Sequence, residues 1–149
     1  MMVNRMNRQD FEAVWVGEKS IVEEVRFLPS EHAQDVYEFD RIEVLANFPG
    51  QIWVHGTYHC RVGCVAYTFW IEGIGPIVRY CMGGSEHGNA GRFHYHEVRL
   101  PSDPRQNLPY VEGRPQMQGL TARQIWDQVL LDAHITHTDQ FFEPEVLCK

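Results

Sequence analysis

The feature that most constrains this fold is a pair of alternating segments, residues 52–59 and 65–72, separated by a short turn. Both segments are rich in aromatic and β-branched residues and repeat with a period of two, which is typical of paired strands. Between them, Arg61-Val62-Gly63 predicts a three-residue hairpin loop with Gly63 in the left-handed conformation. In that arrangement Cys60 and Cys64 face each other across the first pair of the hairpin.

Other short alternating segments extend this hairpin into a sheet. We predict further strands at residues 12–16, 21–28, 36–46, 77–82 and 92–100. Within residues 36–46 the alternation changes phase at Asp40-Arg41, which indicates a bulge or a sharp bend.

One strong helix signal follows late in the chain. Thr121 and Gln124 form the pattern of a capping box, so the helix is predicted to begin at Thr121 and to end near His134. Its predicted buried stripe is Ile125, Trp126, Val129, Leu130 and Ala133. The expected fold is a single α+β domain over residues 1–149, with a mostly antiparallel twisted sheet and one main C-terminal amphipathic helix packed on it.

Two segments show no regular period. Residues 101–119 contain four prolines and are predicted to form a long Pro-rich loop. Residues 135–149 are predicted to form a largely irregular tail.

Composition narrows the range of partners. The net charge of −7, from 13 basic and 20 acidic residues, argues against a protein that coats nucleic acid by charge alone. Residues 76–126 nevertheless carry six arginines against four acidic residues. That segment is either ordinary arginine-rich surface or an anion-binding face, because guanidinium groups bind phosphate and carboxylate.

We expect a cytoplasmic protein with no membrane partner. The longest nearly apolar run, residues 64–71, is far shorter than the roughly 20 residues of a membrane-spanning helix, and the first ten residues hold no apolar signal region. Reduced thiols are therefore expected. His55, His59, Cys60 and Cys64 are four potential zinc ligands, but on one strand Cys60 points away from the histidines, so we expect no structural zinc there.

The candidate site lies around a His-x-His pair. His94 and His96 are two residues apart on a predicted strand, so their side chains project to one face, together with Arg92. The preceding glycine-rich loop, residues 83–91, carries His87, and the strand before it carries Arg79. We expect this face to be open to solvent.

Two chemistries suit these residues. His94, His96 and His87 are candidate catalytic acids and bases, with Arg79 and Arg92 as phosphate-binding residues and no cofactor. Alternatively, His87, His94 and His96 hold zinc or another divalent transition metal.

Residues 51–134 also carry a succession of short patterns: Val54-x-Gly56-x-Tyr58, Tyr67-x-Phe69-x-Ile71, Arg79-Tyr80, His87 and His94-x-His96, followed by the late helix. This succession resembles small toxins of the TumE type, which belong to bacterial toxin–antitoxin pairs. The resemblance implies a ribonuclease-like or other growth-inhibiting activity, an RNA substrate and an antitoxin partner. The acidic residue that often follows Arg-Tyr in these toxins is Cys81 here.

Three functional hypotheses follow from the sequence. The first is a metal-independent endoribonuclease toxin that uses the His-x-His pair and the arginines. The second is a small metal-binding protein or metalloenzyme. The third is a non-catalytic interaction domain that binds a partner through residues 101–119 and its acidic N-terminal half. The sequence leaves homo-oligomer formation open.

Overall fold

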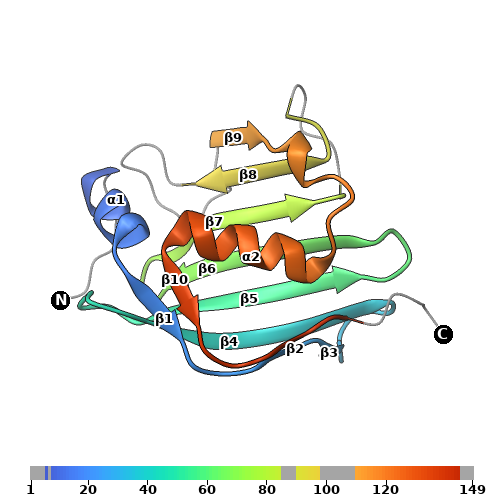
Figure 1. Ribbon diagram of the computed structural model, residues 1–149, viewed down its shortest axis with the longest axis horizontal. Helices are drawn as coiled ribbons and strands as arrows, with labels where there is room; N and C mark the ends of the chain where they lie inside the picture. The colour runs from blue at the N-terminus through green and yellow to red at the C-terminus, as the bar shows by residue number, and fades with distance from the viewer. Residues whose placement is uncertain (1–5, 7, 85–89, 98–109, 145–149) are drawn as a thin grey trace.

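The computed structural model describes residues 6, 8–84, 90–97 and 110–144, and shows a mixed α+β fold (Figure 1). The main sheet has the strand order β10-β1-β4-β5-β6-β7-β8-β9, with β3 also paired to β4. Its strands are β1 (Lys19–Ile21), β3 (Leu28–Pro29), β4 (Val36–Ala46), β5 (Ile52–His59), β6 (Cys64–Ile71), β7 (Gly75–Met82), β8 (Phe93–Glu97), β9 (Tyr110–Gly113) and β10 (Ile135–His137). The pairs from β4 to β9 are antiparallel, whereas β1 and β10 are parallel.

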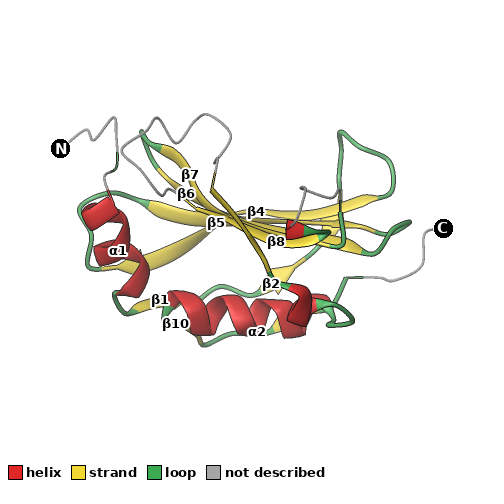
Figure 2. Cartoon of the chain, turned by 90° about the horizontal axis from the view of Figure 1, so that it is seen from above, coloured by secondary structure: helices red, strands yellow, loops and turns green. Residues whose placement is uncertain are grey.

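The helices share one side of this sheet. Figure 2 shows α1 (Arg8–Val16) and α2 (Ala122–Ala133) on the same face, and in Figure 1 α2 lies over the middle strands and runs roughly along them. The remaining elements are a short parallel pair, β2 (Val25–Arg26) with β11 (Phe141–Phe142), and a turn of 3₁₀ helix at Pro115–Met117. The sheet therefore has a helix-covered face and a face that neither helix covers.

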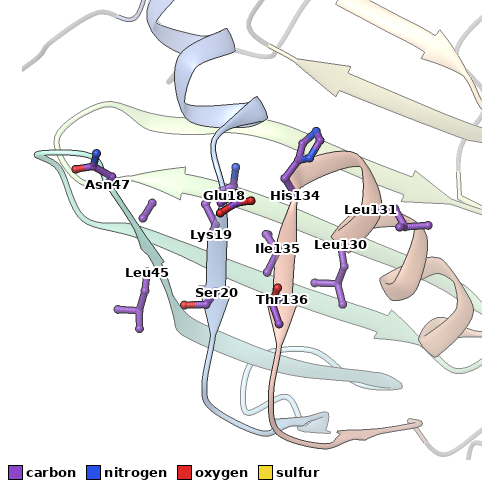
Figure 3. A pocket seen from close by; sticks show the side chains of 11 residues that line it. Glu18, Lys19, Ser20, Leu45, Asn47, Leu130, Leu131, His134, Ile135 and Thr136 are labelled. Atoms are coloured by element: carbon purple, nitrogen blue, oxygen red, sulfur yellow. The ribbon is translucent and has the colours of Figure 1, made fainter.

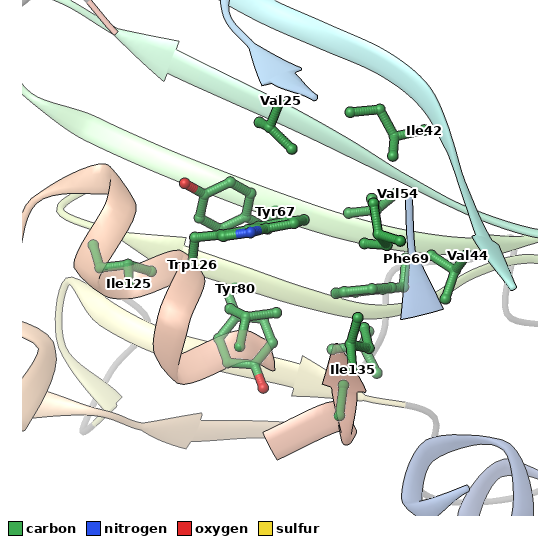
Figure 4. Close-up of a cluster of buried hydrophobic side chains, with 14 of the residues drawn as sticks. Val25, Ile42, Val44, Val54, Tyr67, Phe69, Tyr80, Ile125, Trp126 and Ile135 are labelled. Atoms are coloured by element: carbon green, nitrogen blue, oxygen red, sulfur yellow. The ribbon is translucent and has the colours of Figure 1, made fainter. Parts of the chain in front are cut away.

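The core lies between the sheet and α2 and is dominated by aromatic side chains (Figure 4). The indole of Trp126 is 1% exposed and lies 5.1 Å from the ring of Tyr67 and 6.0 Å from that of Phe39. The Tyr67 hydroxyl donates to the carbonyl of Ala122 at 2.7 Å, and the Tyr80 hydroxyl donates to Asp132 at 2.7 Å. These two hydrogen bonds attach both ends of α2 to the centre of the sheet.

Gly56 is required by the same packing. A Cβ atom at this position would lie 2.2 Å from Cε1 of Phe39, because the Phe39 ring lies directly over the β5 backbone. The alternation in β5 thus contains a glycine where a large apolar residue would otherwise face the core.

The predicted start and end of α2 are confirmed. The Thr121 hydroxyl accepts a hydrogen bond from the Gln124 amide at 3.1 Å, and the Gln124 side chain accepts one from the Thr121 amide at 2.9 Å. His134 closes the helix in the left-handed conformation, with φ of 55°. Of the predicted stripe, Leu130 is only partly buried, while the other four residues are fully buried.

The bulge predicted at Asp40-Arg41 is also confirmed. The β4–β5 register shifts between Phe39 and Ile42, and Arg41 takes a positive φ of 55°.

The strand predicted at residues 12–16 is wrong, because these residues belong to α1. Phe11, Val14 and Trp15 are buried at helical spacing, and Arg8 pairs with Glu12 one turn later. The side chain of Lys19 caps the C-terminal end of this helix. Its buried ammonium donates to the carbonyls of residues 14, 15 and 17 at 2.6–2.8 Å, and burial lowers its pKa to about 8.

The hairpin turn differs in register from the prediction. His59 pairs with Cys64, so Cys60 lies in the turn and the two cysteines do not face each other. Gly63 has the predicted positive φ of 68°. Cys60 is disulfide-bonded, which contradicts the expected reduced thiol, whereas Cys64 and Cys81 are free thiols.

Both segments predicted to be irregular contain strands. β9 and the 3₁₀ turn lie within residues 101–119, and β10 and β11 lie within residues 135–149. β10 and β11 pair with the distant strands β1 and β2, and β9 pairs with β8, the strand before it. All three are short, so no local pattern identifies them. Residues 98–109 and 145–149, which complete the two predictions, lie outside the described ranges.

Candidate metal centre

The β7–β8 pairing brings two residues from each strand together on the helix-free face. Arg79 lies opposite His96, and Cys81 lies opposite His94. Directly paired residues in an antiparallel ladder project to the same side, so these four side chains form a two-by-two block. The intervening Tyr80 and Tyr95 face the helices, with their rings 5.0 Å apart. The predicted shared face of His94 and His96 is therefore confirmed.

Three of the four side chains form a cluster of metal-ligating atoms. One ligand atom from each of Cys81, His94 and His96 lies within 4.8 Å of the others. Within the described ranges, this is the one such group of three or more residues. Ligands of a tetrahedral zinc ion are roughly 3.3–3.8 Å apart, given zinc–ligand bonds of about 2.0–2.3 Å. Small side-chain rotations would therefore bring the three atoms into the first shell of one ion.

The orientation of His94 is fixed by the backbone. Its Nδ1 lies 3.0 Å from the carbonyl oxygen of Gly91, and because a carbonyl can only accept, Nδ1 carries the proton. The lone pair of a neutral His94 is then on Nε2. A backbone carbonyl on one imidazole nitrogen is the usual arrangement for a metal-binding histidine, because it sets both the tautomer and the ring direction.

The expectation that the histidines are open to solvent is wrong. His94 is 1% exposed and His96 is 6% exposed, and their rings meet edge to face with centroids 4.9 Å apart. Cys81 and Arg79 on the neighbouring strand are only half-buried. Access to the cluster from solvent is therefore on the β7 side.

Electrostatics at Cys81 reflect this partial burial. Removal from water raises the pKa of the Cys81 thiol to about 11, and the nearby guanidinium of Arg79 acts in the opposite direction. A metal ion that binds this sulfur must displace its proton.

The structure places the other predicted site residues differently from one another. Arg79 lies in the block, beside His96 and Cys81. Arg92 does not offer its guanidinium to a ligand there, because Nε donates to the carbonyl of Gly84 at 3.0 Å and Nη2 donates to that of Gly83. Arg92 thus stabilises the turn that follows β7. His87, named both as a catalytic residue and as an alternative metal ligand, lies outside the described residues.

Cys81 is the site residue that sequence reasoning missed. Its strand and its face were both predictable, because it lies two residues after Arg79. Its place opposite His94 was not predictable, because the pairing register between β7 and β8, which residues 83–91 connect, cannot be read from the sequence. The signal that could have found it is the alternation Arg79-x-Cys81 beside His94-x-His96.

A wide groove of about 880 Å³ lies elsewhere, where the end of α2 meets β10, β1 and β4 (Figure 3). Its lining includes Leu45, Leu131 and Thr136. The ammonium of Lys19 nearby is occupied by the carbonyls at the end of α1. None of the predicted site residues contributes to this groove.

Comparison with family models, curated proteins and solved structures finds no match for this chain. The chemical properties of the site therefore follow from the residues that form it. Among the described residues, no helix is long and apolar enough to cross a membrane.

Proposed function

We propose that this protein binds a transition-metal ion of the zinc class through Cys81, His94 and His96. The observation that carries the proposal is the convergence of one thiol and two imidazoles from two adjacent strands within 4.8 Å. Thiolate and imidazole are the ligands preferred by zinc and its borderline-soft neighbours.

The number of ligands indicates the kind of site. Structural zinc sites use four protein ligands, whereas catalytic sites use three and keep a fourth position for water or substrate. Among the described residues, Cys81, His94 and His96 supply three, and Cys81 is only half-buried, so water or substrate would reach a fourth position from its side. This arrangement supports a metalloenzyme or a metal carrier better than a purely structural site.

The ribonuclease and toxin hypothesis stays a prediction. Burial bears against it, since imidazoles that are 1% and 6% exposed do not reach the phosphodiester of an RNA chain without movement of the surrounding segments. Expression of the protein in bacteria is the direct test. Growth arrest that is lost in a folded His96→Ala variant would favour the toxin, and normal growth would oppose it.

Cobalt substitution tests the metal proposal. Co²⁺ in a tetrahedral site with a thiolate ligand gives intense visible d–d bands and a sulfur-to-metal charge-transfer band in the near ultraviolet. We expect one Co²⁺ per chain, with both features, and displacement by one equivalent of Zn²⁺. Cys81→Ser should abolish the charge-transfer band, and His94→Gln should weaken binding at least tenfold.

Cys64→Ser is the matched control. Cys64 is the other free thiol among the described cysteines and is also half-buried. It lies on the same face of the sheet, two residues from Ala66, the β6 partner of Cys81. This variant should keep the full cobalt spectrum. Loss of the spectrum in Cys64→Ser but not in Cys81→Ser, or a wild-type protein that binds no Co²⁺, would contradict the proposal.

A further inference from the structure

Arg79 is the fourth residue of the two-by-two block on β7 and β8 and lies beside the proposed metal ligands. Its side chain is half-buried, and it lies opposite His96 and two residues from Cys81 on the same face of β7. No hydrogen bond or ion pair of Arg79 occurs among the residues that the structure describes.

Among the described residues, the acidic side chains on this face lie away from the block. The β9 residues beside the block are Val111, opposite His96, and Gly113, opposite His94. On the other side, β6 contributes Thr68 opposite Arg79. Among the described residues, the carboxylates on the cross-strand lines that pass through Arg79 and Cys81 are on β4. One of them, Asp40, lies 3.4 Å from His55. β4 is three strands from β7, or roughly 14 Å at about 4.8 Å per strand.

The charge of the loaded site therefore calls for an anion. A divalent metal, one thiolate and two neutral imidazoles carry a net charge of +1, and the guanidinium of Arg79 adds another. Such charges are costly in a partly buried site unless a counter-charge is present. Arg79 lies directly opposite one of the three ligands, His96, and two residues from another, Cys81, so one anion could bind both the metal and the guanidinium.

We propose that the site binds a phosphate-class oxyanion, with one oxygen on the metal and others on the guanidinium of Arg79. This inference rests on the proposed metal site. Alternate residues of a strand are about 6.6–7 Å apart, so a tetrahedral anion with several oxygens spans from the metal to the guanidinium better than a single-atom anion does. Arginine also binds phosphate through paired hydrogen bonds.

Two sources share this chemistry: free phosphate and the terminal phosphate of a monoester. The burial of His94 and His96 restricts the ligand to the side of Arg79 and Cys81, where a monoester can direct its organic group to solvent. The test therefore includes both inorganic phosphate and adenosine 5′-monophosphate.

The experiment is a titration of the Co²⁺-loaded full-length protein, followed by its visible spectrum. Inorganic phosphate should shift the d–d bands with saturation, and chloride at the same ionic strength should not. Arg79→Gln should keep one Co²⁺ per chain but weaken phosphate binding about 10- to 100-fold, as expected for loss of charged hydrogen bonds. Arg123→Gln, which removes an exposed arginine from α2, should change phosphate binding less than twofold.

The outcomes separate the two proposals. A protein that binds no Co²⁺ overturns both. A protein that binds Co²⁺ but whose spectrum is unchanged by phosphate keeps the metal site and overturns the anion site. Equal phosphate affinity in Arg79→Gln and wild type shows that the metal alone binds the anion, and overturns the role of Arg79. Saturation by the monophosphate ester assigns the ligand as a phosphate monoester, and saturation by inorganic phosphate alone assigns it as free phosphate.

Discussion

On β7 and β8, neighbouring residues point to opposite faces of the sheet and meet opposite surroundings. Tyr80 and Tyr95 enter the aromatic core beneath α2, where hydroxyl and ring contacts fix their positions. One residue along each strand, Cys81 and His94 lie on the helix-free face, among groups that bind metals and anions. The same backbone ladder therefore presents core residues on one face and the candidate metal ligands on the other.

The two faces also differ in how their polar side chains are partnered. The helix-covered face satisfies its polar groups internally, as with the Tyr67 hydroxyl on the Ala122 carbonyl. Arg79, on the helix-free face, has no such partner among the described residues. We expect substitutions on the first face to change the free energy of unfolding, and substitutions on the second to change ligand binding.

The largest expected effect is on the helix-covered face. Trp126→Ala should lower the free energy of unfolding by about 3–5 kcal/mol, because it removes a buried indole that contacts Tyr67 and Phe39. Urea denaturation measures the change. Leu131→Ala on the same helix is the control, since Leu131 is 70% exposed and should change stability by less than about 0.5 kcal/mol. Equal effects of the two substitutions would contradict the assigned core.

Metal addition should stabilise the folded state by a smaller amount. Zinc at a free concentration 100 times its dissociation constant should raise the free energy of unfolding by about 2.7 kcal/mol, because it binds the folded chain alone. Cys81→Ser should show no increase at the same zinc concentration, whereas Cys64→Ser should respond as wild type does. Stabilisation of Cys81→Ser by zinc would place the ion elsewhere.

His137 offers an intermediate test at the edge of the core. Its Nε2 donates to the carbonyl of Glu23 at 2.7 Å, and its Nδ1 accepts from the indole N–H of Trp126 at 3.2 Å. His137→Leu removes both hydrogen bonds and should cost about 2 kcal/mol. Cobalt binding should be unaffected, since His137 is on β10 at the far end of the sheet order. A loss of cobalt binding would show that the two faces are not independent.

The smallest effect is expected at the start of α2. Thr121→Ala removes the capping hydrogen bond to the Gln124 amide and should cost about 1 kcal/mol. Thr121→Ser keeps a hydroxyl acceptor and should cost less than half of that amount. Thermal unfolding of the two variants side by side gives the comparison, and identical midpoints would mean that the cap contributes nothing.

Local patterns predicted the parts of the fold that local physics determines. The two strands of the β5–β6 hairpin, the bulge in β4 and the capping box of α2 each depend on residues close in sequence, and each is confirmed, although the register of the hairpin turn is not. The shared face of His94 and His96 also follows from strand geometry alone. In contrast, α1 is a nine-residue helix whose apolar run at residues 13–16 is also compatible with a short strand, so the local pattern did not distinguish the two.

Pairing between distant segments could not be predicted in the same way. β10 is a short strand whose partner, β1, is far along the chain, and β9 pairs with β8 across an intervening segment of 12 residues, 98–109. The place of Cys81 beside His94 depends on the register between β7 and β8, and that register is set by the tertiary fold. Burial of the two histidines also depends on the tertiary fold, so the expectation of a solvent-open site was wrong for the same reason.

The most direct test of the metal centre is X-ray absorption at the zinc edge of the zinc-loaded, full-length protein. The proposed site predicts one sulfur at about 2.3 Å and two imidazole nitrogens at about 2.0–2.1 Å, with one further light atom in the fourth position. Multiple scattering from two imidazole rings should be present, and the sulfur should disappear in Cys81→Ser but persist in Cys64→Ser. A first shell without sulfur, or one with two sulfurs, would contradict a site formed by Cys81, His94 and His96.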